Sequence, residues 1–223
     1  MLDLKNRRPL KSRETKLAGK IAQALAARGV TPNAISQASM GAALVAALAF
    51  WGSAETSGVA RALLLVLAAL GCQARLLCNL FDGMVAVEAG KGAPDGPFWN
   101  EFPDRVSDIL ILVGAGLAAG MPEWGWAAAS LAVLTAYTRE LGAGIGLVPD
   151  FSGPMAKPQR MAALTAAAVL AVAEGWLWQR EIILPLAIVA VTLGAAATVV
   201  RRGARVDLRV LRPTGAGAHS VRH

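Results

Sequence analysis

The chain has 223 residues, of which 55% are hydrophobic and only 17% are charged. This balance excludes an ordinary soluble domain of that size and predicts an integral membrane protein. The formal net charge is +7, but no basic face carries interleaved aromatic residues, so we expect membrane lipids rather than nucleic acid as partners. The two cysteines lack paired or metal-binding spacing, which excludes a disulfide framework and a zinc site.

Residues 1–30 form a predicted cytoplasmic segment rich in Lys and Arg. Leu17, Ile21 and Leu25 recur in it at helical spacing with lysines beside them, which predicts an amphipathic interfacial helix on anionic lipid, ended by Gly29. A cytoplasmic helix packed on the rest of the protein fits the same pattern equally well.

Six apolar stretches follow, each long enough to cross the roughly 30 Å hydrocarbon core of a bilayer as a helix. They lie near residues 34–53, 57–89, 98–120, 122–146, 156–176 and 181–200. The stretches are rich in Ala and Leu and show no apolar–polar alternation, so they predict an all-α, six-transmembrane-helix bundle. We place this domain at residues 31–202 and expect a flexible basic tail at 203–223.

The orientation follows from the positions of Lys and Arg. These residues gather before the first stretch and after the last one, so the positive-inside rule places both ends of the chain in the cytoplasm. An even number of spans agrees with that placement. We therefore expect a multi-pass protein of the cytoplasmic (inner) membrane.

Two neighbouring stretches each place polar and small residues on one helical face. On the second stretch these are Asn79, Asp82, Gly83 and Ala86. On the third they are Asn100, Asp104 and Asp108. The Gly- and Pro-rich turn at residues 90–97 can bring the two faces together.

The chemistry of these side chains favours a metal or phosphate site over structural filler. An ionised Asp within a membrane helix costs about 2.5 to 3.5 kcal/mol, and hard oxygen ligands suit Mg²⁺ or Mn²⁺. Gly83 allows a ligand to approach the backbone closely, although close helix packing explains Gly83 and Ala86 equally well.

The same residues carry a resemblance to a known family. The spacing from Asn79 to Asp104 is similar to the signature of the CDP-alcohol phosphotransferases, D-x2-D-G-x2-A-R-x8-G-x3-D-x3-D. The segment "TPNAIS" at 31–36 and the "RE" at 139–140 extend the likeness over most of the chain. The sequence departs from the signature at three positions, because two of its aspartates are asparagines here and its arginine is Val87.

The resemblance implies a six-helix membrane transferase of phospholipid synthesis. It would move a phosphatidyl or phosphoalcohol group from CDP-diacylglycerol, or another CDP-linked donor, to an alcohol acceptor and release CMP. Carried over by position, the metal ligands are Asn79, Asp82, Asn100 and Asp104, and Asp104 is also the catalytic base. The implied cofactor is Mg²⁺ or Mn²⁺, and since two asparagines remove two charges, one ion rather than two is an alternative. A homodimer is implied in the same way.

We assign the remaining polar residues near the signature to the two substrates. The residues assigned to the CDP group are Asp82, Gly83, Ala86, Gly96 and Arg75. The residues assigned to the acceptor are Arg105, Asp108, Arg139 and Lys157. For Arg75, a phosphate contact and a snorkelling structural role fit equally well, and the positive-inside rule alone also accounts for Lys157 and Arg160.

Two other classes of function stay open. The loss of two carboxylates fits a homologue without transfer activity that binds lipid or a partner protein, and binding of metal and CDP-lipid without turnover would identify it. An ion or proton transporter would also use buried carboxylates, but it predicts inverted repeats and paired broken helices, and the sequence shows no such symmetry.

Overall fold

A computed structural model of the protein describes residues 15–88, 95–178 and 180–211, and it places seven α-helices within them. The helices are α1 (Lys16–Ala27), α2 (Pro32–Ala54), α3 (Gly58–Glu88), α4 (Gly96–Ala118), α5 (Pro122–Gly144), α6 (Lys157–Leu177) and α7 (Ile183–Leu211). The all-α class is confirmed, and each predicted span coincides with one of the helices α2 to α7. Most of the Gly- and Pro-rich turn lies outside the described residues.

The predicted boundary of the C-terminal tail is wrong. Residues 203–211 belong to α7 rather than to a flexible tail. Arg205 explains part of this extension, because it forms an ion pair of 2.8 Å with Asp150 in the loop between α5 and α6. Arg202 donates to the backbone oxygen of Ser152 in the same loop at 2.9 Å. The last turns of α7 are therefore fixed by the protein, and residues 212–223 lie outside the described part.

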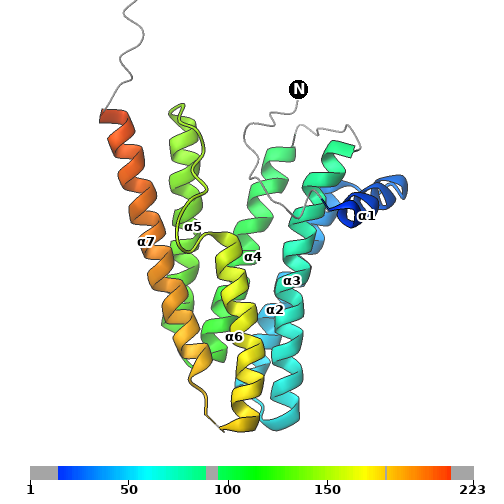
Figure 1. The fold of residues 1–223 in the computed structure, drawn as a ribbon, viewed down its shortest axis with the longest axis vertical. Coiled ribbons are helices and arrows are strands. Elements are labelled where there is room, and N and C mark those ends of the chain that lie inside the picture. The colour runs from blue at the N-terminus through cyan, green and yellow to red at the C-terminus, as the bar shows by residue number, and fades with distance from the viewer. Residues whose placement is uncertain (1–14, 89–94, 179, 212–223) are drawn as a thin grey trace, which may run out of the picture.

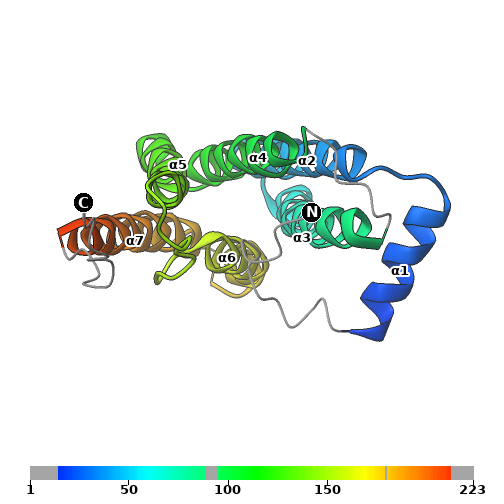
Figure 2. The ribbon, with the colours of Figure 1, turned by 90° about the horizontal axis from the view of Figure 1, so that it is seen from above.

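The helices α2 to α7 run side by side along the long axis of the molecule (Figure 1). Seen along that axis, they form two rows, with α5, α4 and α2 in one and α7, α6 and α3 in the other (Figure 2). The helix α1 lies at one side of the two rows, next to α3, and runs across the direction of the other helices (Figures 1 and 2).

Four of the described helices are long and apolar enough to cross a membrane, namely α2, α3, α6 and α7. The helix α4 belongs to the same bundle, but it carries four charged side chains between residues 101 and 108. A total of six spans therefore stays a prediction. The helix predicted near the N-terminus exists as α1 and ends before Gly29, whose φ is 75°. Its place at the membrane interface also stays a prediction.

Small residues bring α2 into close contact with both helices that carry the polar faces. A Cβ atom on Gly71 of α3 would lie 2.8 Å from the Cβ of Ala46, and one on Gly114 of α4 would lie 2.7 Å from the Cα of Ala47. Such approaches are typical of helices that associate in membranes. They fix α3 and α4 against one common neighbour, which sets the position of their polar faces.

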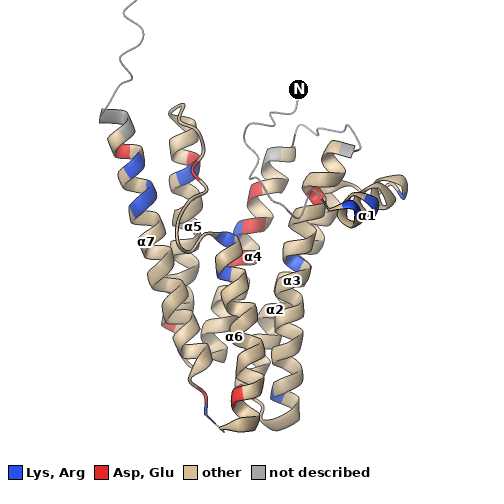
Figure 3. Ribbon diagram, viewed as in Figure 1, with Lys and Arg blue, Asp and Glu red and all other residues tan. Residues whose placement is uncertain are grey.

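The far end of the bundle is held by a buried carboxylate. Glu174, near the end of α6, accepts hydrogen bonds from the backbone N–H groups of Ile182 and Ile183 at 2.9 and 3.1 Å. These groups belong to the start of α7, whose N–H groups have no partner within the helix. Most of the other charged side chains gather at the opposite end (Figure 3).

Candidate active site

The predicted polar faces of α3 and α4 meet at this charged end. The amide nitrogen of Asn79 on α3 donates to Oδ1 of Asp104 on α4 at 2.7 Å. The helix α4 begins at Gly96 with a proline in its first turn, which suits a helix start. The structure thus brings together the two motif halves that the sequence separates by a turn.

Asp82 is the buried carboxylate of the α3 face. Its Oδ2 accepts a hydrogen bond of 3.0 Å from the hydroxyl of Ser36 on α2, and its Oδ1 accepts one from the backbone N–H of Gly83. Among the residues that the structure describes, no Lys or Arg forms an ion pair with Asp82. Sequence reasoning did not assign Ser36 a role, although it belongs to the "TPNAIS" segment that carries the family likeness.

Asp104 is surrounded by cations. It forms ion pairs with Lys157 from the first turn of α6, with Arg75 of α3 at 3.5 Å, and with Arg105 at 3.6 Å. The side chain of Asp104 is 12% exposed and that of Lys157 is 23% exposed, so both are within reach of a ligand. The predicted base and one predicted acceptor residue are therefore in direct contact.

Asp108 lies one turn deeper on α4, in a fully buried group of three charges. It pairs with Arg75 at 2.7 Å and with Arg160 of α6 at 2.6 Å. The side chains of Asp108 and Arg75 are 1% and 0% exposed, and the two are engaged in an ion pair with each other. The assignment of Arg75 to the CDP group and of Asp108 to the acceptor stays a prediction. Arg160, which the positive-inside rule had explained, belongs to this group instead.

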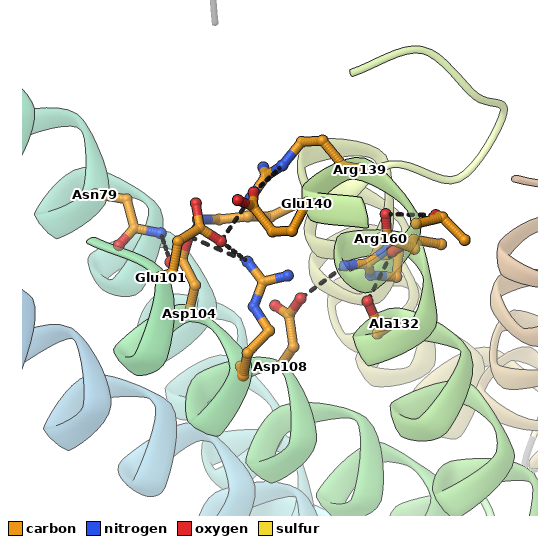
Figure 4. A network of polar contacts seen from close by, with 12 residues as sticks. Asn79, Glu101, Asp104, Asp108, Ala132, Arg139, Glu140 and Arg160 are labelled. Carbon is orange, nitrogen blue, oxygen red and sulfur yellow. Dashed lines mark hydrogen bonds and ion pairs between the residues drawn. The ribbon is translucent and has the colours of Figure 1, made fainter. Parts of the chain in front are cut away.

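The rim of the site is a second set of ion pairs, on the solvent side of Asp104. Glu101 of α4 pairs with Arg105 at 3.3 Å and with Arg139 of α5 at 2.5 Å, and Arg139 also pairs with Glu140 at 2.6 Å. Figure 4 shows this chain of contacts leading down to Asp104 and Asp108. The predicted acceptor residues Arg105 and Arg139 thus lie at the entrance, above the buried group.

The other motif positions are less enclosed. Asn100 is exposed, one turn before Asp104 on α4, whereas Gly83, Ala86 and Gly96 are half-buried. These residues leave small or polar surfaces beside the two carboxylates.

The ion pairs around Asp104 and Asp108 form one connected network, with nearly balanced charge. Its cations are Arg75, Arg105, Arg139, Lys157 and Arg160. Its carboxylates are Glu101, Asp104, Asp108 and Glu140. With Asp82 nearby, the number of carboxylates equals the number of cations. The site is thus close to neutral before any ligand or metal binds.

This donor set fits one divalent ion better than two. Within the described ranges, no group of three or more His, Cys, Asp and Glu is placed to hold an ion. In the part of the chain that the structure describes, Asp82 has no cation paired with it. Asn79 of α3 and Asn100 of α4 carry amide oxygens, which are hard ligands of the kind that such an ion prefers. Asp104, by contrast, is paired with cations on several sides and faces the amide nitrogen of Asn79.

No protein-family profile and no curated protein matches the sequence. Solved structures do match. Phosphatidylinositol phosphate synthase (PgsA1) of Mycobacterium tuberculosis with CDP-DAG bound superposes with a TM-score of 0.71 at 19% identity, covering 86% of this chain and 94% of that one. The chain has the fold of this synthase.

Two further structures of the synthase agree. PgsA1 in complex with manganese and citrate gives a TM-score of 0.69, with 85% of this chain and 88% of that chain covered, again at 19% identity. The apo form gives 0.68, with 85% and 95% covered, at the same identity. PgsA1 is a CDP-alcohol phosphotransferase, so the fold implied by the sequence resemblance is confirmed.

Proposed function

We propose that the protein transfers a phosphatidyl or phosphoalcohol group from a CDP-linked donor, CDP-diacylglycerol in the first place, to an alcohol acceptor in phospholipid synthesis. One observation carries the proposal: Asp82 and Asp104, from two different helices, lie with Lys157 at the charged end of a bundle whose fold is that of a synthase with CDP-DAG bound. The resemblance of the motif to the signature of the CDP-alcohol phosphotransferases implies the same reaction.

The reaction requires one displacement at phosphorus. The acceptor oxygen forms a bond to the β-phosphorus of the donor while the bond from that phosphorus to the bridging oxygen breaks, and CMP leaves with the bridging oxygen. Asp104 takes the proton of the acceptor hydroxyl. Lys157, in contact with Asp104, is placed to stabilise negative charge that develops on the transferred group.

A divalent ion would assist at Asp82. Mg²⁺ or Mn²⁺ held by Asp82 and the amide oxygens of Asn79 and Asn100 would supply positive charge toward the pyrophosphate when bound. The manganese complex of PgsA1 supports a divalent ion in this fold. One such ion, with two positive charges, matches the roughly two negative charges of a pyrophosphate in an otherwise neutral site.

The remaining residues are assigned by their position. The half-buried Gly83, Ala86 and Gly96 allow a CDP group to approach the backbone of α3 and α4. Arg105 and Arg139 at the rim suit an anionic or phosphorylated acceptor. Arg75 and Asp108 are assigned a supporting role below the substrates, because they are buried.

We further propose that the site faces the cytoplasm in the inner membrane. The helix α1, the end of α7 and the charged cluster lie at the same end of the bundle (Figures 1 and 3), and the basic residues of the chain ends favour the cytoplasmic side. A homodimer is proposed from the family resemblance.

The test is CMP release from CDP-diacylglycerol by the purified protein with Mn²⁺ or Mg²⁺ and a pool of acceptor alcohols. Asp104→Asn and Asp82→Asn should abolish release, while Glu140→Gln, at an exposed carboxylate of the rim, should retain most of it. A folded protein that binds the donor but releases no CMP with any acceptor would refute transfer and support a non-catalytic lipid-binding protein.

A further inference from the structure

We propose that Lys157 takes the place of a metal ion in this chain: its ammonium group neutralises Asp104, and Asp104 binds no divalent ion. The inference deepens the proposed function and rests on it for the identity of the site, but its test needs no turnover. The ion pair with Lys157 distinguishes Asp104 from Asp82, with which no described Lys or Arg forms an ion pair.

Lys157 occupies an unusual position for a cation. It is the first residue of α6, and Arg160 follows in the same turn, while that turn contains no acidic residue. The N-terminus of a helix carries partial positive charge, so cations are unfavourable there unless other groups compensate them.

The compensation comes from α4. Asp104 pairs with Lys157, and Asp108, one turn further along α4, pairs with Arg160 at 2.6 Å. Two successive turns of α4 thus supply one carboxylate each to the first turn of α6. Lys157 is therefore a structural partner of Asp104 and not a side chain that only awaits a substrate.

The surroundings of Asp104 carry several positive charges. A divalent ion on its carboxylate would face Lys157, Arg75, Arg105 and the positive end of α6 together. Repulsion between like charges at such distances is strong where water is largely excluded. Asp82, which accepts hydrogen bonds from the hydroxyl of Ser36 and the backbone N–H of Gly83, offers an ion a better place.

The two asparagines of the motif suit a site that contains Lys157. With Lys157 as a fixed cation, the network and Asp82 together are neutral, and aspartates at positions 79 and 100 would add two unpaired negative charges. Asn79 instead uses its amide nitrogen to donate to Asp104, which an aspartate cannot do. The asparagines and Lys157 therefore form a consistent set.

The experiment is a titration of purified protein in detergent with Mn²⁺ alone, followed by electron paramagnetic resonance, which counts free and bound ions. We expect the unmodified protein to bind one ion, Asp104→Asn to bind it with an affinity within twofold, and Asp82→Asn to bind it at least tenfold more weakly. Glu140→Gln is the matched control for the loss of a carboxylate outside the two positions.

A gain-of-binding variant tests the same point in the other direction. A triple variant combines Asn79→Asp, Asn100→Asp and Lys157→Met. It restores the two carboxylates of the signature and removes the ammonium group, so we expect it to bind a second ion. The single Asp104→Asn variant keeps the proposal testable if this triple variant does not fold.

Two results would overturn the proposal: two ions bound to the unmodified protein, or an affinity lowered more than tenfold by Asp104→Asn. Binding of no ion at all would support a metal-free Asp104 and would overturn the assignment of an ion to Asp82. Because neither donor nor acceptor is present, a protein that fails to release CMP can still give every expected result, so the two proposals fail independently.

Discussion

Asp108→Asn should destabilise the protein more than any other loss of a single charge in the network. The change keeps the volume of the side chain but removes the counter-ion of two guanidinium groups that lie 2.7 and 2.6 Å away and are 0 and 2% exposed. Breaking a buried ion pair by removing one partner costs about 3 to 5 kcal/mol. In a protein of this length each kcal/mol lowers Tm by about 2 to 4 °C, so we expect a fall of roughly 6 to 20 °C.

Thermal unfolding in detergent, followed by circular dichroism, measures this fall. Glu101→Gln is the matched control, because it also removes one carboxylate with two arginine partners but at a side chain that is 34% exposed, where ion pairs contribute about 0 to 1 kcal/mol. Replacing Asp108, Arg75 and Arg160 together with Leu and Met should recover much of the loss. Equal falls in Tm for Asp108→Asn and Glu101→Gln would refute the reasoning.

Three further predictions concern other parts of the molecule. Ser36→Ala removes the hydrogen bond to Asp82, the motif carboxylate of α3. Because hydrogen bonds to charged groups contribute about 1.5 to 3 kcal/mol, the rate of CMP release should fall about tenfold or more, and a change under twofold would contradict this. Gly71→Ala places a methyl group 2.8 Å from α2 and should lower the free energy of unfolding by about 1 to 3 kcal/mol in SDS titrations, whereas Gly41→Ala, with nothing within 4 Å, should not. Burial acts to raise the pKa of Asp150, but hydrogen bonds from Ser152 and Arg205 prevail and lower this pKa from 3.8 to about 2. At pH values above 3.8 the loop between α5 and α6 should therefore be protected from hydrogen exchange, and it should lose this protection as the pH falls through about 2. The variant Asp150→Asn should show no such transition.

Periodicity and spacing predicted most of the helices and half of the site. Asn79 and Asp104 were placed on facing surfaces of adjacent helices, and the structure joins them by a hydrogen bond. That prediction succeeded because the two helices are neighbours in the chain, so a short turn decides which faces meet. Each apolar stretch coincides with a helix, because a stretch that was chosen to be long enough to cross a bilayer is also long enough for several helical turns; six spans stay a prediction.

Contacts between distant parts of the chain could not be predicted. Lys157 lies 53 residues from Asp104, and Ser36 lies 46 residues from Asp82. Hydrophobic patterns show which side of a helix is buried, but the choice of neighbour is made by close packing such as that at Gly71. The tail boundary failed for the same reason, since Arg205 looks like a solvated charge until Asp150 is placed beside it.

The pairing of α4 with the first turn of α6 has a consequence for how the chain enters the membrane. Ribosomes make the N-terminal helices first, so the aspartates of α4 emerge while Lys157 and Arg160 are still unmade. Among their ion-pair partners, Arg75 of α3 and Arg105 of α4 are already present at that stage. A helix with ionised carboxylates is costly to release into lipid. On the prediction that α4 crosses the membrane, we expect it to stay beside water or the insertion machinery until α6 is made, so that the charged cluster is completed late in the biogenesis of the protein.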